Sequence, residues 1–240
     1  MKYFIFLLIP FSAFAFTPTM NSGEAKILYS CEALSEFPTK SEENTEITFY
    51  EKELFLYKQG IILRKREKFS ETDFTVKYRP ASNKEVDIDE SIYNDLSSSQ
   101  TGELKCEYDI TYNEDSPEMT SSCSFKTPTS NLTVEHYNFI SMAKLKIPSE
   151  YLQLSHLGQP KVKSTSWKLR VTPGPLSKSP VLERWEIKGE CLLELSGRFN
   201  FENQEAMKTN LPSVFNYLKS IVKSSPLKKQ GNKTLKALTQ

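Results

Sequence analysis

Apolar and polar residues alternate with a period of two in many short runs along most of this chain. That alternation places the two kinds of side chain on opposite faces of an extended strand. It predicts strands at 26–34, 46–50, 60–67, 73–79, 103–112, 119–126, 162–172, 181–188 and 190–199. Because strands outnumber helices and no fixed repeat is present, the pattern favours one antiparallel α+β domain over residues 24–224.

Helical patterns are fewer and shorter. Residues 54–59 form either a helical turn or a loop, and residues 82–95 form either a helix or an acidic loop. Short helices are expected within 131–144 and 148–158, and a longer one within 203–225, where Pro212 should open a second half. The last residues, 225–240, are basic and polar, which predicts a flexible tail.

The first fifteen residues have the pattern of a secretory signal peptide. Lys2 precedes an apolar run, and Ala13-Phe14-Ala15 is a small-residue cleavage pattern. The apolar run is short for a membrane span, so a retained anchor is the less favoured alternative. We expect residues 1–15 to be removed, no membrane span afterwards, and a protein that is periplasmic or secreted.

The four cysteines all lie after this segment. An even number of cysteines in an exported chain indicates disulfides. Cys106 and Cys123 flank the turn signal Asn-Glu-Asp-Ser-Pro, so a hairpin there brings them opposite each other. This pairs Cys106 with Cys123 and leaves Cys31 with Cys191 by elimination.

Overall charge excludes some classes of partner. The chain has 31 Lys and Arg against 30 Asp and Glu, a formal net charge of +1. A near-neutral protein has no global field for nucleic acid or an anionic membrane, so we predict neither as a partner. An electrostatic function therefore has to depend on local separation of charge. No feature of the sequence predicts an oligomeric state.

Charge is in fact sorted by sign within the predicted strands. Three strands carry cationic pairs two residues apart, and another carries one cation followed by two acids. A half-solvated sheet is the default explanation for alternating charge. However, single-sign clusters repel each other on an open face, which favours a cavity that holds a polyanion and a cation. The residues are Arg64 and Arg66, Lys77 and Arg79, Lys168 and Arg170, and Lys105 with Glu107 and Asp109.

These stretches resemble the CYTH, or triphosphate tunnel metalloenzyme, superfamily. "FYEKELFLYKQGIILRKR", residues 49–66, is similar to its Tyr-Asp-Thr, Leu, Gly, Leu-Arg-x-Arg succession. "FTVKYR" resembles its next strand, with Lys77 in the place of the tunnel lysine, and "LKCEYDI" resembles its basic-then-acidic strand. The family includes thiamine, inorganic and RNA triphosphatases and a class of adenylyl cyclases.

The resemblance implies an antiparallel β-barrel with a tunnel, flanking helices and a C-terminal helix. It implies a triphosphate held by cations and by Mg²⁺ or Mn²⁺. The implied phosphate-binding residues are Arg64, Arg66, Lys77, Arg79, Lys105, Lys168 and Arg170, and the implied metal ligands are Glu107, Asp109, Glu194 and Glu32.

The sequence departs from the family on the metal side. The family's first strand carries Glu-x-Glu-x-Lys, whereas "KILYSCEALSEF" offers Glu32 alone, with no lysine two places on. A final acidic pair is reduced to Glu194 with Ser196. Fewer carboxylates weaken divalent-ion binding, so the anion side is the better preserved of the two.

Three functions remain open. The first is a metal-dependent hydrolase of a triphosphate, a polyphosphate or another phosphorylated small molecule. The second is a non-catalytic binder of polyanions with a degenerate metal site. The third is a disulfide-stapled interaction domain whose charges merely face solvent.

Overall fold

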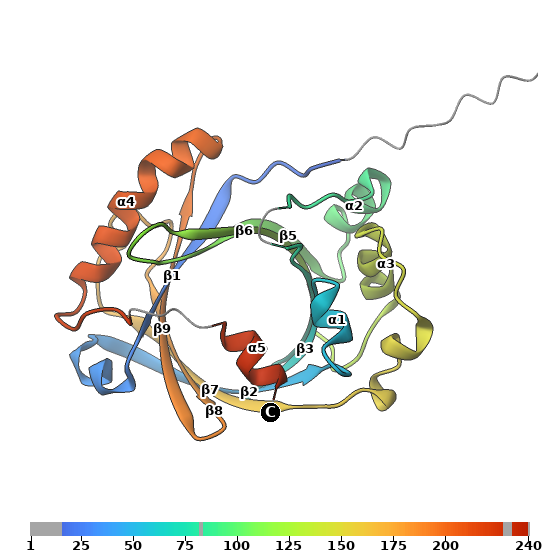
Figure 1. The fold of residues 1–240 in the computed structure, drawn as a ribbon, viewed down its shortest axis with the longest axis horizontal. Coiled ribbons are helices and arrows are strands. Elements are labelled where there is room, and N and C mark those ends of the chain that lie inside the picture. Colours follow the sequence, from blue (N-terminus) through green and yellow to red (C-terminus); the bar gives the residue numbers. More distant parts are fainter. Residues whose placement is uncertain (1–15, 82–83, 228–231, 240) are drawn as a thin grey trace, which may run out of the picture.

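Nine strands form the body of the protein, and helices flank them (Figure 1). The structure is a computed structural model that describes residues 16–81, 84–227 and 232–239. The predicted signal peptide, residues 1–15, lies outside the described residues. The strands are β1 (Ser22–Tyr29), β2 (Thr39–Tyr50), β3 (Ile61–Lys68), β4 (Thr72–Tyr78), β5 (Glu103–Thr111), β6 (Glu118–Thr127), β7 (Lys161–Leu169), β8 (Val181–Ile187) and β9 (Glu190–Asn200).

The helices lie between these strands or after them. They are α1 (Phe55–Lys58), α2 (Glu90–Ser97), α3 (Val134–Met142), α4 (Gln204–Ser220) and α5 (Lys233–Leu238), with 3₁₀ turns at Cys31–Glu36, Ser149–Leu152 and Leu154–His156. Among the described residues, no helix combines the length and the apolar character needed to cross a membrane.

The strands close into a barrel in the order β1-β5-β6-β4-β3-β2-β7-β8-β9, with β9 paired to β1. All neighbouring pairs are antiparallel except β1 and β5, which run parallel. This arrangement confirms the predicted α+β fold with a barrel. A closed barrel has no unpaired edge, and every strand has an inner and an outer face.

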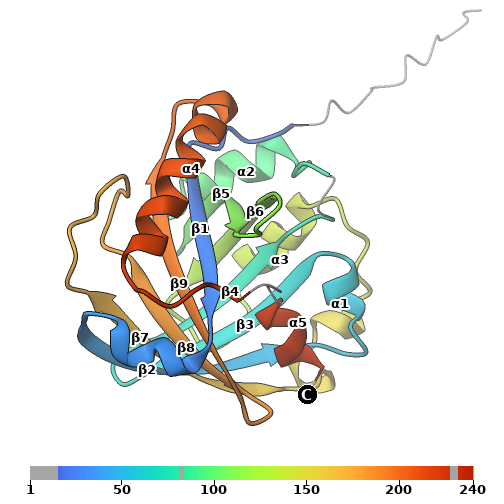
Figure 2. The same cartoon turned by 60° about the vertical axis from the view of Figure 1, so that its left-hand side comes forward.

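The outer face of the barrel is its hydrophobic side. On β4, Phe74 and Val76 point outward and are fully buried beside α3. On β9, Leu195 and Phe199 point outward and pack with Phe215 of α4. Figure 2 shows α4 lying along β1, so this helix covers the outer face there. β4 and β9 therefore turn their polar face inward and their apolar face toward the helices.

Two predicted strands differ in their ends. β1 begins at Ser22, four residues earlier than expected, and it ends at Tyr29 because the chain turns into a 3₁₀ segment at Cys31. β2 begins at Thr39, and its first half is exposed while it pairs with β7. The exposed half of β2 has no alternating apolar residues, so the sequence pattern predicted only the buried part at 46–50.

Two predictions at the C-terminus also need correction. Pro212 does not open a new helix, because α4 is continuous and contains it. Pro212 is exposed, so water can satisfy the carbonyl that loses its helical donor. Residues 225–240 are not simply a flexible tail: α5 lies within them, at one opening of the barrel (Figure 1).

The two predicted disulfides are both present. Cys106 and Cys123 join directly opposed positions of β5 and β6, a separation of 17 residues. Cys31 joins Cys191 at the start of β9, a separation of 160 residues. The second bridge ties the N-terminal strand region to the hairpin of β8 and β9.

Removal of the longer bridge should cost more stability than removal of the shorter one. A crosslink stabilises by restricting the unfolded chain, and the loop-entropy relation gives about 5 kcal/mol for Cys31–Cys191 and about 3 kcal/mol for Cys106–Cys123. Urea unfolding of the Cys31→Ala/Cys191→Ala and Cys106→Ala/Cys123→Ala variants measures both. Equal losses, or the reverse order, would contradict this account.

Candidate functional site

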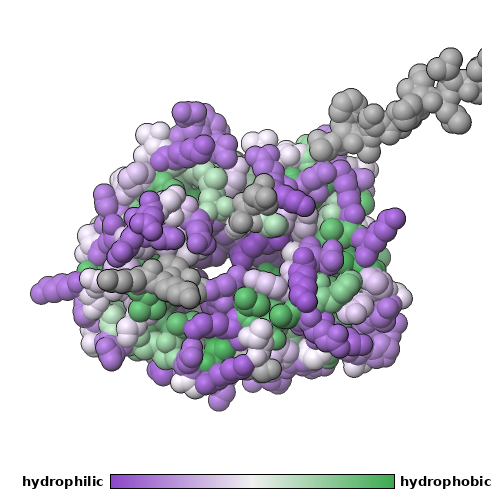
Figure 3. Space-filling model, in the orientation of Figure 1, coloured by the Kyte–Doolittle hydropathy of each residue, from purple (hydrophilic) through white to green (hydrophobic). Residues whose placement is uncertain are grey.

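The barrel encloses a cavity of about 360 Å³ that is lined mainly by charged side chains. Figure 3 shows a central opening bordered by hydrophilic residues. A second cavity of about 530 Å³ lies toward α1 and α5, and the two share Lys26, Arg79, Glu194 and Lys233. They are therefore adjoining parts of one interior. The cations that line the first cavity are Lys26, Arg64, Arg66, Lys77, Arg79, Lys105, Lys126, Lys178, Arg198 and Lys233.

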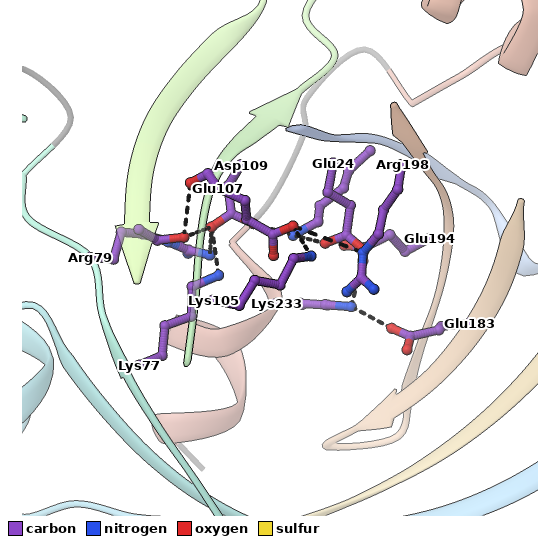
Figure 4. A network of polar contacts seen from close by, with 12 residues as sticks. Glu24, Lys77, Arg79, Lys105, Glu107, Asp109, Glu183, Glu194, Arg198 and Lys233 are labelled. Carbon is purple, nitrogen blue, oxygen red and sulfur yellow. Dashed lines mark hydrogen bonds and ion pairs between the residues drawn. The ribbon is translucent and has the colours of Figure 1, made fainter. Parts of the chain in front are cut away.

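Asp109 of β5 is the junction of this charged interior. Its Oδ1 accepts a hydrogen bond from Lys26 Nζ at 2.6 Å, and its Oδ2 accepts from Lys77 Nζ at 2.6 Å and from an Arg79 guanidinium nitrogen at 2.8 Å. Ser122 Oγ donates a further bond at 2.8 Å. Burial alone would raise the pKa of Asp109, but the three cations hold it well below its ordinary value. Asp109 is therefore a buried, ionised carboxylate that orients three cations (Figure 4).

Gly60 places Arg79 at this junction. The Arg79 backbone N–H donates to the Gly60 carbonyl at 2.7 Å. A Cβ at position 60 would lie 2.4 Å from the Arg79 carbonyl oxygen, and Gly60 has a φ of +80°. Only glycine combines that conformation with so close an approach of two backbones.

Two further carboxylates lie beside Asp109. Glu24 of β1 contacts Lys26 Nζ at 2.9 Å and Arg198 Nε at 3.5 Å. Glu107 of β5 pairs with Lys105 and lies 3.8 Å from Arg198 Nε. Burial opposes ionisation of Glu24, but Lys26 and Arg198 lower its pKa to about 2. The interior thus has an acidic region embedded among cations (Figure 4).

The pKa values of the two lysines that contact Asp109 are shifted in opposite directions. Burial lowers the pKa of Lys26, but Asp109 and Glu24 together raise it above its ordinary value. Lys77 has Asp109 as a neighbouring acid, and burial with the adjacent Arg79 and Lys26 lowers its pKa to about 8. Lys77 therefore carries its charge at a cost in free energy that a bound anion would reduce.

Arg64 and Arg66 of β3 lack acidic partners of their own. In the part of the chain that the structure describes, neither forms an ion pair within hydrogen-bonding range. Arg64 Nε is buried and has no hydrogen-bond partner there. Burial and the adjacent Arg66 lower the pKa of Arg64 to about 9. Asp73, Glu183 and Glu24 attract Arg64, and Glu183 attracts Arg66, but none of these acids forms an ion pair with either arginine in the described structure. Two neighbouring cations without a contacting carboxylate attract an anion.

One side of the interior is apolar. Ile47 and Phe49 of β2 lie opposite Arg66 and Arg64 in the ladder, so they share the inner face with them. They pack in one cluster with Trp185 of β8 and Ala237 of α5. The interior therefore has a cationic wall and an apolar wall that faces α5.

Five of the seven predicted phosphate-binding residues line the first cavity: Arg64, Arg66, Lys77, Arg79 and Lys105. Lys168 and Arg170 do not line it, and both are exposed. Lys168 stands at the end of β7, and Arg170 follows the strand. Their spacing is the same as in the other pairs, but Lys168 lies at the last rung of the ladder between β7 and β8, opposite Val181, and Arg170 lies beyond the strand.

Glu24, Glu107 and Asp109 form a group that could hold a metal ion, because one oxygen of each lies within 4.8 Å of the others. Two of the four predicted metal ligands, Glu107 and Asp109, belong to this group. Glu194 lines the same cavity, but its Oε1 contacts Lys233 Nζ at 2.6 Å. Glu32 is exposed on the 3₁₀ turn after β1 and is not part of the group.

Glu24 and Lys26 take the place that the sequence assigned to Glu32. The stretch "SGEAKILY" places Glu24 and Lys26 on one face and Ala25 and Ile27 on the other. It resembles the Glu-x-Lys half of the Glu-x-Glu-x-Lys pattern described above, with Ser22 at the first position. This signal was present, but the strand was expected to begin four residues too late.

No protein-family model matches this chain, and no curated protein matches it. Solved structures are similar over most of its length. A candidate adenylyl cyclase from Hippeastrum, described as having a dominant triphosphatase activity, is 11% identical, with 90% of this chain and 94% of that chain covered and a TM-score of 0.49. A candidate adenylate cyclase from Bacillus halodurans is 13% identical over 90% and 98%, with a TM-score of 0.43.

The closed barrel with a charged interior agrees with the fold that the family resemblance implied. The strands, the barrel closure and the cationic lining are the parts of that expectation that the structure contains. Fold and lining together leave little support for the third hypothesis, in which the charges merely face solvent, because the sorted cations lie inside the barrel.

Substitution of Asp109 should destabilise the barrel strongly. Asp109→Asn removes the charge that neutralises three buried cations, and breaking a buried pair on one side costs about 3–5 kcal/mol. Urea unfolding measures the loss. Asp87→Asn is the matched control, because Asp87 pairs with Lys144 on the surface and should cost less than about 1 kcal/mol. Equal effects of the two changes would show that the junction is not a buried electrostatic centre.

Proposed function

We propose that the barrel interior binds a condensed phosphate, such as a triphosphate group or a short polyphosphate. We further propose that it hydrolyses this ligand when Mg²⁺ or Mn²⁺ binds at Glu24, Glu107 and Asp109. The observation that carries the proposal is the pair Arg64 and Arg66, two neighbouring interior cations that form no direct ion pair with a carboxylate among the described residues.

The charge balance of the interior supports an anionic ligand. Burying cations beside other cations is unfavourable: burial first, and the neighbouring cations second, lower the pKa values of Arg64 and Lys77. Each can be neutralised by phosphate oxygens, which accept charge-assisted hydrogen bonds from guanidinium and ammonium groups. A ligand with several phosphates can reach both groups at once, whereas a single phosphate cannot neutralise the whole wall.

The positioning of the other cations supports the same ligand. Asp109 fixes Lys77 and Arg79 at defined distances, and Asp109 is itself held by Ser122. Side chains that are already ordered lose little conformational entropy when a ligand binds. The closed barrel keeps these cations in place despite their mutual repulsion.

The three carboxylates fit a hard divalent cation, since carboxylate oxygens are the donors that Mg²⁺ and Mn²⁺ prefer. Lys26 already contacts Glu24 and Asp109, so an ion would share these two ligands with an ammonium group. A bound divalent ion would supply charge neutralisation at the reacting phosphate. Lys105 and Arg198, which contact Glu107, stand beside it to neutralise phosphate oxygens.

A non-catalytic polyanion-binding barrel is the second candidate. It is favoured by one observation: each carboxylate of the group already has a protein cation as partner, namely Lys26, Lys105 or Arg198. In that case the acids serve to position cations, and the ligand is held without turnover.

We infer that the protein functions outside the reducing cytosol. Its two disulfides support this, because such bonds persist in oxidising compartments. The predicted signal peptide agrees with the same inference.

Loss of either Arg64 or Arg66 should weaken binding of tripolyphosphate. Arg64→Ala and Arg66→Ala each remove charge-assisted hydrogen bonds, which should cost about 1.5–3 kcal/mol in binding free energy. Isothermal titration calorimetry with tripolyphosphate measures this. Lys168→Ala and Arg170→Ala are matched controls from exposed positions and should leave the affinity unchanged. If the controls weaken binding as much as the arginine variants, the ligand does not bind in the interior.

Hydrolysis should depend on a divalent metal and on the acidic group. Phosphate release from tripolyphosphate and ATP is measured with and without Mg²⁺ or Mn²⁺, for the native protein and for Glu24→Gln. The hydrolase proposal expects metal-dependent turnover that falls at least about tenfold in the variant. Binding of tripolyphosphate without turnover in any metal would instead establish the non-catalytic barrel.

A further inference from the structure

The side chain of Lys233 reaches from α5 into the barrel interior. Its Nζ lies 2.7 Å from Glu183 Oε2 and 2.6 Å from Glu194 Oε1. The same ammonium lies 4.2 Å from the centroid of the Trp185 ring. Figure 4 shows Lys233 between the carboxylates of Glu183 and Glu194. A cation is thus held by two acceptors and one aromatic face.

The three residues that surround Lys233 all belong to strands of the barrel. Glu183 and Glu194 lie directly opposite each other in the β8–β9 ladder. Trp185 is buried, and its Nε1 donates to Glu183 Oε2 at 3.0 Å, which orients that carboxylate. We call Glu183, Trp185 and Glu194 the ammonium cage. Its geometry comes from two paired strands, so it does not depend on α5.

The cage requires a cation. Carboxylates directly opposite each other on one face of a sheet repel. Burial raises the pKa of Glu183, yet Lys233 and then Arg66 bring it well below the ordinary value. The carboxylate is therefore ionised because a cation is present. Two hydrogen-bond acceptors and an aromatic face suit a primary ammonium group, which donates its N–H groups and lies over the ring. A quaternary ammonium could use only the ring.

Outside the cage, α5 is held by modest contacts. Ala237 is the fully buried residue of this helix, and it is small. Lys236 pairs with Glu190 at 2.8 Å on the surface, and Asn232 Nδ2 donates to Tyr57 Oη at 2.8 Å in an exposed contact. Lys233 is therefore the principal polar anchor of α5 in the interior.

We propose that the ammonium cage is a binding site for the primary ammonium group of a small alkylamine, and that Lys233 occupies it as a tethered internal ligand. An amine that binds the cage displaces Lys233 and releases α5 from the barrel opening. Release would uncover the cavity of about 530 Å³ that Lys233, Thr234 and Asn232 line. This proposal does not depend on phosphate binding, because the cage and the lysine that occupies it both belong to this chain.

The first test uses the Lys233→Ala variant with n-butylammonium, which copies the end of a lysine side chain. The variant removes the one cation that contacts both opposed carboxylates in the described structure, and its Tm should fall by roughly 5–10 °C. Added n-butylammonium should restore much of this loss and reach saturation. Tetramethylammonium has the same charge but no N–H donor, so it should not. Lys236→Ala, which removes a surface pair, should show neither the loss nor the rescue.

The second test keeps the native chain. Hydrogen exchange of residues 232–239 is followed while n-butylammonium is added. A tethered group competes at an effective concentration on the order of millimolar, so displacement requires amine above that range. Exchange in α5 should then accelerate at least about tenfold, while tetramethylammonium at equal concentration leaves it unchanged.

Two results would overturn the proposal. One is a Lys233→Ala variant that n-butylammonium stabilises no more than tetramethylammonium does. The other, which also applies if that variant does not fold, is unaltered exchange of α5 in the native chain at amine concentrations well above millimolar. Neither experiment contains phosphate, so failure here leaves the phosphate proposal untouched, and failure of that proposal leaves the cage untouched.

Discussion

The structure depends on holding side chains of like charge close together inside a closed barrel. Lys26, Lys77 and Arg79 meet at one buried carboxylate, Asp109, and Arg64 and Arg66 lie in the same interior without a direct ion pair among the described residues. Flexible cations on an open surface would move apart and be screened by solvent. The barrel prevents both, because its strands fix each residue by backbone pairing that does not depend on the charge of the side chain.

This constraint explains why β1, β4 and β9 turn their polar residues inward and their apolar residues outward, although β2 and β8 also contribute an apolar wall to the interior. Because charged side chains line much of the interior, most of the hydrophobic burial has to come from the outer faces of the strands. The outer residues of β1, β4 and β9 bury themselves under α3 and α4, and the two disulfides add crosslinks. Stability therefore comes from the outer layer, and the interior is free to hold ion pairs and a ligand.

Sequence alternation predicted the strands and the resemblance implied the barrel. Most of the lining was found because Arg64, Lys77 and Lys105 lie within strands that also have buried apolar neighbours. It could not distinguish Lys168, which has the same spacing but lies where β7 leaves the cavity. Glu24 was missed because β1 begins before its apolar run. Lys233 was missed for a physical reason: α5 buries little besides Ala237, so its sequence is that of a solvated tail.

The position of a bound phosphate tests the central claim most directly. A crystal structure of the oxidised protein soaked with tripolyphosphate and Mn²⁺, with anomalous scattering to locate the metal, would show it. Our account predicts phosphate oxygens in contact with Arg64, Arg66 and Lys77, and Mn²⁺ at Glu24, Glu107 and Asp109. Tripolyphosphate bound on the outer surface, with an unaltered interior, would contradict it.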